Sequence, residues 1–172
     1  MIEVKVTKNI HEEAEQRNLE FFERFGNSGT HRGDKNRQRM TGYLAEACIK
    51  SEFPEMKYSE DFNIDFNFQS MSIDSKAQGC NSKPLGHYSA TLYEEQRDRH
   101  TDYYIFNRVK NDFNNVWICG IISKEKFFKL SKLKKAGTRT NNFTYDQSRY
   151  ELEYKHLASL QRFVDYYKSK TK

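Results

Sequence analysis

The sequence has few cysteines, and their spacing does not suit a zinc site. Cys48, Cys80 and Cys119 lie far apart, with no Cys-x-x-Cys pair and no suitably placed histidine. Zinc fingers and zinc ribbons are excluded, because these modules hold the metal with closely spaced ligands. We expect three free thiols, with Cys48 and Cys119 as small core residues. Such usage is typical of a protein kept in a reducing compartment.

Long apolar runs are also missing. The longest, such as residues 116–122, are far shorter than the roughly 20 apolar residues that a membrane-spanning helix needs. No signal peptide is recognisable at the beginning of the sequence. We therefore expect a cytoplasmic protein without a membrane partner.

The five histidines form no catalytic motif. They are scattered along the chain, without the helical spacing of a zinc hydrolase or the partners of a nucleophilic triad. We expect each of them to be structural or exposed.

Aromatic residues and positive charge are what the composition does supply. Hydrophobic residues make up only 36% of the 172 residues, but 13 Phe and 11 Tyr concentrate apolar area in few side chains. This length suits one domain spanning residues 1–172. The net charge of +5 favours a polyanionic partner.

Two carboxylates and an amine lie on a segment that alternates like two short strands. Side chains two positions apart share a face of a strand, so Asp74, Lys76 and Gln78 point the same way. A bend near residues 69–70 would return Asp65 beside Asp74, where both could hold a hard cation such as Mg²⁺. Asp61 has the same strand parity and is a rival to Asp65. A solvated polar hairpin is the structural alternative.

A helix is expected just before this hairpin, over residues 34–53. Asp34 is a suitable N-cap, and apolar side chains recur at helical spacing from Met40 through Leu44. Glu46 lies beside this stripe, where it could reach a cation held by the hairpin. Its alternative role is that of an ordinary exposed glutamate.

The order and spacing of these residues resemble the PD-(D/E)xK nuclease superfamily. The resemblance covers about residues 34–135 and is carried by Gly42-Tyr-Leu-Ala-Glu46, Asp65 and Ile73-Asp74-Ser75-Lys76. Further similarity to small phage-encoded members is seen at Pro84, Tyr88, 101–106 and 116–128. The chain departs from the commoner pattern at Ser75, which stands at a usually apolar position, and at Ile64, where a proline often precedes the first aspartate. Ser75 therefore needs a hydrogen-bond partner or some solvent.

The resemblance implies an α/β fold with a restriction-endonuclease-like mixed sheet flanked by helices. It also implies a DNA endonuclease in which Glu46, Asp65 and Asp74 bind Mg²⁺ and Lys76 positions or deprotonates the attacking water. Mn²⁺ is expected to substitute, since all three ligands are hard oxygens. A phage-encoded enzyme would act in the host cytoplasm. The alternative is a noncatalytic nucleic-acid-binding protein that retains the fold.

The DNA structure that would be cut is left open by the sequence. A branched junction, a duplex, a flap and a single strand would all use the same core, and a homodimer would suit two symmetric cuts. Arginines favour phosphate geometry, so the basic residues before the Glu46 helix are candidate DNA contacts: Arg32, Lys35, Arg37 and Arg39. Gln78 is a further candidate, unless Gly79 begins a turn. The second basic run, residues 124–139, reads as a solvated helix face.

The remaining elements follow from periodicity and turn residues. We expect a first helix over residues 7–25, a loop over 26–33 and a short helix over 87–99. Strands are expected over 103–109 and 116–122, then a helix from Ser123, a loop over 136–142, a strand over 149–154 and a helix over 157–168. Trp117 is expected either to pack in the core or to stack on a base.

Overall fold

A computed structural model describes residues 1–26, 34–61, 63–140 and 143–170. The helices are α1 (Lys8–Phe25), α2 (Lys35–Glu52), α3 (Lys124–Leu130) and α4 (Leu160–Lys170), with 3-10 turns η1 (Glu94–Asp98) and η2 (Tyr154–His156). The strands are β1 (Ile2–Lys5), β2 (Lys57–Tyr58), β3 (Phe66–Phe68), β4 (Met71–Cys80), β5 (Ser89–Tyr93), β6 (Tyr103–Lys110), β7 (Asn115–Ser123), β8 (Lys132–Lys134) and β9 (Arg149–Glu153). The predicted loop over 26–33 lies almost wholly outside the described residues.

The main sheet is mixed and has six strands in the order β1-β7-β6-β4-β3-β2. β4 and β6 run parallel, and the other neighbouring strands run antiparallel. β3 pairs with β4 only from Phe66 to Phe68, so among the described residues β4 from Ser75 onward has β6 on one side and a free edge, without a paired strand, on the other. This free edge is where the candidate site lies. The predicted α/β class with a mixed sheet flanked by helices is confirmed.

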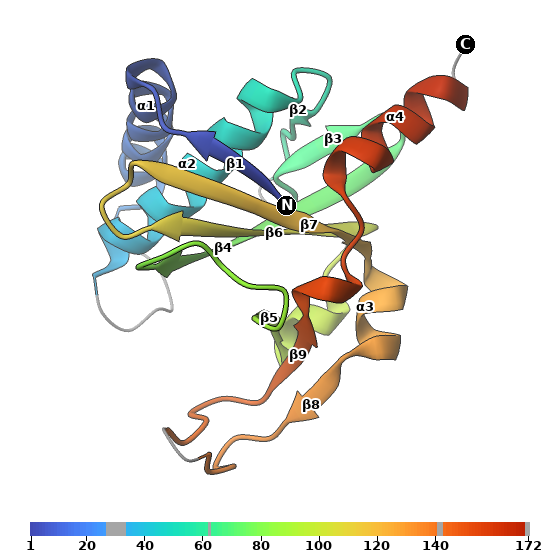
Figure 1. The fold of residues 1–172 in the computed structure, drawn as a ribbon. Helices are drawn as coiled ribbons and strands as arrows, with labels where there is room; N and C mark the ends of the chain where they lie inside the picture. Colours follow the sequence, from blue (N-terminus) through green and yellow to red (C-terminus); the bar gives the residue numbers. More distant parts are fainter. Residues whose placement is uncertain (27–33, 62, 141–142, 171–172) are drawn as a thin grey trace.

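Helices α1, α2 and α4 cover one face of this sheet (Figure 1). The sequence forms α2 as predicted, because Asp34 accepts a hydrogen bond from the Arg37 backbone N–H and so caps its first turn. Leu44 and Cys48 of α2 are fully buried against Ile73 and Ile105 of the sheet. The helix that carries Glu46 is thereby fixed over β4.

The opposite face packs on α3 and on a small sheet with the strand order β5-β9-β8. Phe106 of β6 stacks on Phe127 of α3 with ring centroids 5.4 Å apart, and Leu92 and Leu152 of the small sheet complete this second core. Trp117 is buried in it at 4% exposure. Of its two predicted roles, packing is therefore the one that the structure supports.

Two sequence predictions on this side of the molecule are wrong. The predicted helix over 87–99 is strand β5 followed by η1, because Ser89–Tyr93 pairs along its whole length with β9. The basic run does not continue as a helix after Leu130, since Lys132–Lys134 pairs with β9 as strand β8. In both places, pairing with a distant segment overrides the local pattern.

The predicted positions of the cysteines are confirmed. Cys48, Cys80 and Cys119 are free thiols, and Cys48 and Cys119 are buried. Burial raises the pKa of both buried thiols to about 12, so they are protonated and chemically inert at neutral pH. Within the described ranges, no helix is both long and apolar enough to cross a bilayer.

Gly120 allows the segment before α4 to pass close to β7. Ile121 and Ala158 exchange two backbone hydrogen bonds of 2.9 Å, and a Cβ placed on Gly120 would lie 2.6 Å from the Ala158 carbonyl oxygen. Gly120 also has φ +152, a conformation that other residues rarely adopt.

We predict that Gly120→Ala lowers the free energy of unfolding by about 2 kcal/mol or more, because a backbone contact cannot give way as a side chain can. Urea unfolding measures the change. Gly86→Ala is the matched control, since a Cβ there meets nothing within 4 Å. Equal stabilities of the two variants would contradict the claim that the close approach of Ala158 to β7 requires glycine at position 120.

Candidate active site

The β3–β4 hairpin places Asp65 next to Asp74. Gln69 and Ser70 form the bend, with Gln69 at φ 54, and Phe66 pairs with Ile73. Asp65 precedes this pair and Asp74 follows it, and the Asp65 backbone N–H donates to the Ile73 carbonyl at 3.1 Å, so the two acids lie next to each other just past the end of the ladder. The Asp65 carboxylate also accepts a 2.6 Å hydrogen bond from the Ser75 backbone N–H. It thus replaces the strand partner that β4 lacks at this point.

Asp61, the rival ligand, lies in a turn instead of a strand. Its carboxylate accepts hydrogen bonds of 2.9 and 3.1 Å from the backbone and side chain of Asn63. The strand parity that made Asp61 a candidate does not apply in a turn. Of the two aspartates, Asp65 is the one beside Asp74.

Buried Asp74 and half-buried Lys76 form an ion pair on β4. Lys76 Nζ lies 2.7 Å from Asp74 Oδ1, and Asp74 is 3% exposed. Arg99 Nη1 lies 3.6 Å from the other oxygen, Oδ2, which is too far for a good hydrogen bond. Asp74 Oδ2 is buried and, within the described residues, has no hydrogen-bond donor. A buried carboxylate oxygen in this condition is costly unless a cation compensates it.

Glu46 is buried on α2 and is held by Arg17 of α1. Its Oε2 accepts a hydrogen bond from Arg17 Nη1, and the guanidinium lies 3.9 Å from the ring centroid of Tyr58. Burial raises the pKa of Glu46, and the charge of Arg17 opposes this rise. Glu46 therefore has a cationic partner within the protein.

The charges of the three acids act on one another. Burial raises the pKa of Asp65 well above its ordinary value, and the negative charges of Glu46 and Asp74 raise it further. The Lys76 ammonium and the Ser75 N–H act in the opposite direction. Mutual repulsion among closely placed carboxylates is the electrostatic setting in which a divalent cation binds.

The structure gathers the predicted metal ligands only in part. Asp65 and Asp74 lie next to each other, whereas Glu46 is turned to Arg17, and no three His, Cys, Asp or Glu side chains of the described residues are grouped closely enough to hold a metal ion. The two neighbouring carboxylates fit a hard dication such as Mg²⁺, and Asp74 Oδ2, which has the Arg99 guanidinium at 3.6 Å but no hydrogen-bond donor among the described residues, could still take a ligand bond. Glu46 would complete the ligand set only after leaving Arg17.

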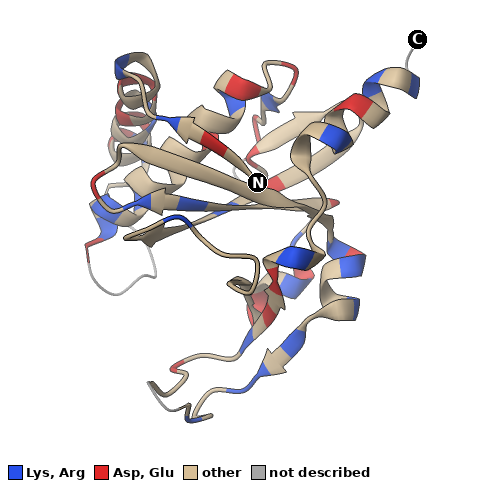
Figure 2. Ribbon diagram, in the orientation of Figure 1, with Lys and Arg blue, Asp and Glu red and all other residues tan. Residues whose placement is uncertain are grey.

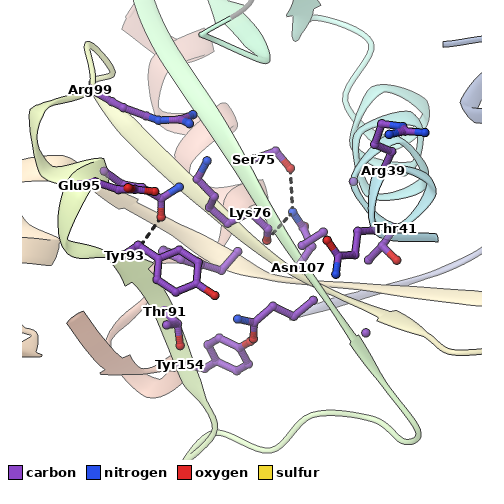
Figure 3. Close-up of a pocket in the computed structure, with 17 residues that line it drawn as sticks. Arg39, Thr41, Ser75, Lys76, Thr91, Tyr93, Glu95, Arg99, Asn107 and Tyr154 are labelled. Atoms are coloured by element: carbon purple, nitrogen blue, oxygen red, sulfur yellow. Dashed lines mark hydrogen bonds between the residues drawn. The ribbon is translucent and has the colours of Figure 1, made fainter. Parts of the chain in front are cut away.

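A cavity of about 580 Å³ opens beside Lys76, along the free edge of β4 (Figure 3). One wall comes from α2, including Arg39 and Thr41, and the other from β5, η1, Arg99 and Tyr154. Figure 3 shows Lys76 between Arg99 on one side and Arg39 on the other. The lining carries three basic side chains against one acidic one, Glu95, which suits an anionic ligand.

Asn107 fastens β4 to β6 where the cavity lies. Its Nδ2 donates to Ser75 Oγ at 3.0 Å and lies 3.5 Å from the Lys76 carbonyl oxygen (Figure 3). Ser75 thereby has the hydrogen-bond partner that its sequence position requires. Asn107 is 1% exposed and sits at a register shift between Phe106 and Asn107. It holds the backbone that carries Lys76.

The structure places only some of the predicted DNA contacts at the cavity. Arg39 and Gln78 line the cavity, and β4 continues to Cys80, so Gly79 does not begin a turn. Arg37 points elsewhere, because its guanidinium donates to the Asn111 carbonyl and lies 4.9 Å from the centroid of Phe113. Lys35 begins α2 outside the cavity lining. Arg32 lies outside the described residues.

Sequence reasoning missed three polar residues of this site, Arg17, Arg99 and Asn107. Only Asn107 had a local signal, since it interrupts the otherwise apolar first half of β6, Tyr-Tyr-Ile-Phe-Asn. Arg17 and Arg99 approach from segments whose own patterns carry no sign of the acids that they meet. The chain matches no protein-family model, and no curated protein is similar to it at a significant level.

Proposed function

We propose that this protein is a metal-dependent DNA endonuclease with a restriction-endonuclease-like fold. The observation that carries the proposal is the ion pair of buried Asp74 with Lys76, next to Asp65, in which Lys76 lines a cavity with Arg39 and Arg99 in its walls. Acid, acid and lysine in this order are the residues that the PD-(D/E)xK resemblance assigns to phosphodiester hydrolysis. A solvated hairpin would not bury Asp74 to 3% exposure.

Asp65 and Asp74 would hold Mg²⁺, with Glu46 as a further ligand. A bound Mg²⁺ supplies charge for the phosphate and lowers the pKa of a coordinated water. Lys76, held by Asp74, presents an ammonium to the cavity and can orient the attacking water or stabilise negative charge on the phosphate. Arg39 and Arg99 would position the DNA strand from opposite walls.

The test is cleavage of labelled DNA by the purified protein. Junction, duplex, flap and single-stranded substrates are each incubated with Mg²⁺, with Mn²⁺ and with EDTA. We expect cuts with either ion and none with EDTA. If DNA is bound but no substrate is cut with any divalent ion, the endonuclease proposal fails.

A noncatalytic DNA-binding protein is the second candidate, and one observation favours it. Glu46 is paired with Arg17 and Asp74 with Lys76, so two of the three acids have cationic partners without any metal. Under this proposal, the acids stabilise the fold, no DNA is cut with any divalent ion, and divalent ions do not change the affinity for DNA. A homodimer acting in the cytoplasm would be compatible with either candidate.

A further inference from the structure

The positive charge of this chain is concentrated in one segment, residues 124–139. This segment carries seven Lys or Arg against one Glu, a net charge of +6, whereas the whole chain carries +5. The other residues together are therefore slightly acidic. Figure 2 shows the blue residues following one another along α3, β8 and the start of the connection to β9. We call residues 124–139 the basic segment.

Most of this charge is not neutralised within the molecule. Lys135 forms a 3.2 Å ion pair with Glu94, and in the described part of the chain it is the only member of the basic segment paired with a carboxylate. Lys126, Lys129, Lys132 and Arg139 are exposed. A cluster of like charges is unfavourable for the folded state by itself, so a polyanionic partner is the simplest role for it.

After α3, the basic segment forms one side of a two-stranded arm. β8 pairs with β9, and beyond it the Tyr145 N–H donates to the Thr138 carbonyl and the Tyr145 carbonyl accepts from the Gly137 N–H, with a further bridge between Arg139 and Thr144. Figure 1 shows this arm projecting away from the main sheet on the side of β5. The cavity beside Lys76 has β5 as part of its wall. A polymer lying in the cavity therefore has the arm on one flank.

We propose that the basic segment binds the phosphate backbone of duplex DNA that continues beyond the cavity. This inference rests on the proposed function, because it identifies the DNA flank that the same site would accept. A two-stranded ribbon fits the major groove of B-DNA, and lysines at its edges reach phosphates without reading sequence. The enzyme would thus require a duplex arm next to the cut, which excludes single strands as its main substrate.

The test measures DNA affinity in EDTA, so that it does not depend on cleavage. The variant K132E/R139E is compared with K5E/K57E, which removes two exposed lysines outside the segment and changes the net charge equally. We expect K132E/R139E to weaken binding of a 30-base-pair duplex at least tenfold. The slope of log affinity against log salt concentration should fall by the equivalent of about two phosphate contacts. K5E/K57E should weaken binding less than threefold. Single-stranded DNA affinity should change less than duplex affinity.

A second pair, K126E/K129E on α3, repeats the test if the first variant does not fold. Equal losses in the segment variants and in K5E/K57E would overturn the proposal, as would unchanged duplex affinity. Binding to vesicles that contain phosphatidylserine is measured for the same variants. If the segment variants lose vesicle binding but keep duplex binding, the proposal is overturned and the segment is assigned to an anionic membrane surface. Because no cleavage is measured, loss of duplex binding supports this inference even if the endonuclease proposal fails.

Discussion

Replacing Lys76 with methionine is expected to lower the rate of DNA cleavage by about 10³-fold. Methionine keeps the apolar part of the side chain but removes the ammonium that lies 2.7 Å from Asp74 and faces the cavity. Loss of one preorganised charge at a reacting phosphate costs about 10²–10³ in rate, and here the same charge also holds an acid in place. Asp74→Asn should cause a loss of similar size. Single-turnover cleavage of the preferred substrate measures both.

Binding must be followed in the same variants. DNA affinity in Ca²⁺ or EDTA should fall less than tenfold in both, because one phosphate contact at most is lost. Lys57→Met, at an exposed lysine of β2, is the control and should cleave normally. A Lys76→Met protein that cleaves within fivefold of the parent would contradict the role assigned to this residue.

Replacing Arg17 with methionine is expected to lower the free energy of unfolding by about 3 kcal/mol. Arg17 is the cationic partner of a carboxylate that is only 6% exposed, and removing one member of a buried pair leaves the other uncompensated. The double variant R17M/E46Q should recover at least half of the loss, since no buried charge remains. Lys8→Met, at an exposed position of α1, should change stability by less than about 0.5 kcal/mol.

This deficit should depend on pH. Burial holds the pKa of Glu46 above its ordinary value, and Arg17 is the largest opposing influence, so its loss raises that pKa further. A group with a raised pKa favours folding when protonated, and this stability is lost as pH rises from its unfolded toward its folded pKa. R17M should therefore differ less from the parent at pH 5 than at pH 8. A deficit that is the same at both pH values would show that lost packing, not charge, explains it.

The elements that contain the acids and Lys76 could be predicted from the sequence because their signals are local. Asp34 caps α2, and the alternation around Gln69 and Ser70 gives a hairpin that brings Asp65 next to Asp74. The small sheet could not be predicted in this way. Its central pairing joins Ala90 to Leu152, and neither segment shows by itself that it has such a partner.

The environment of the acids was also beyond the sequence. Glu46 looked like a residue free to reach a cation, but α1 packs beside α2 and brings Arg17 to it. Arg99 reaches Asp74 from the end of η1, which periodicity had assigned to a longer helix. Contacts between side chains on separate elements depend on packing angles that no local pattern records.

The most direct test of the central claim, that Asp65 and Asp74 together hold a divalent cation beside Lys76, is Mn²⁺ binding followed by electron paramagnetic resonance without DNA. The parent should bind Mn²⁺ with a Kd below about 1 mM, competitively with Mg²⁺, as expected for paired hard-oxygen ligands. Asp74→Asn and Asp65→Asn should each weaken this binding at least tenfold, whereas Asp61→Asn should leave it unchanged. Equal Mn²⁺ affinity in all four proteins would contradict the claim.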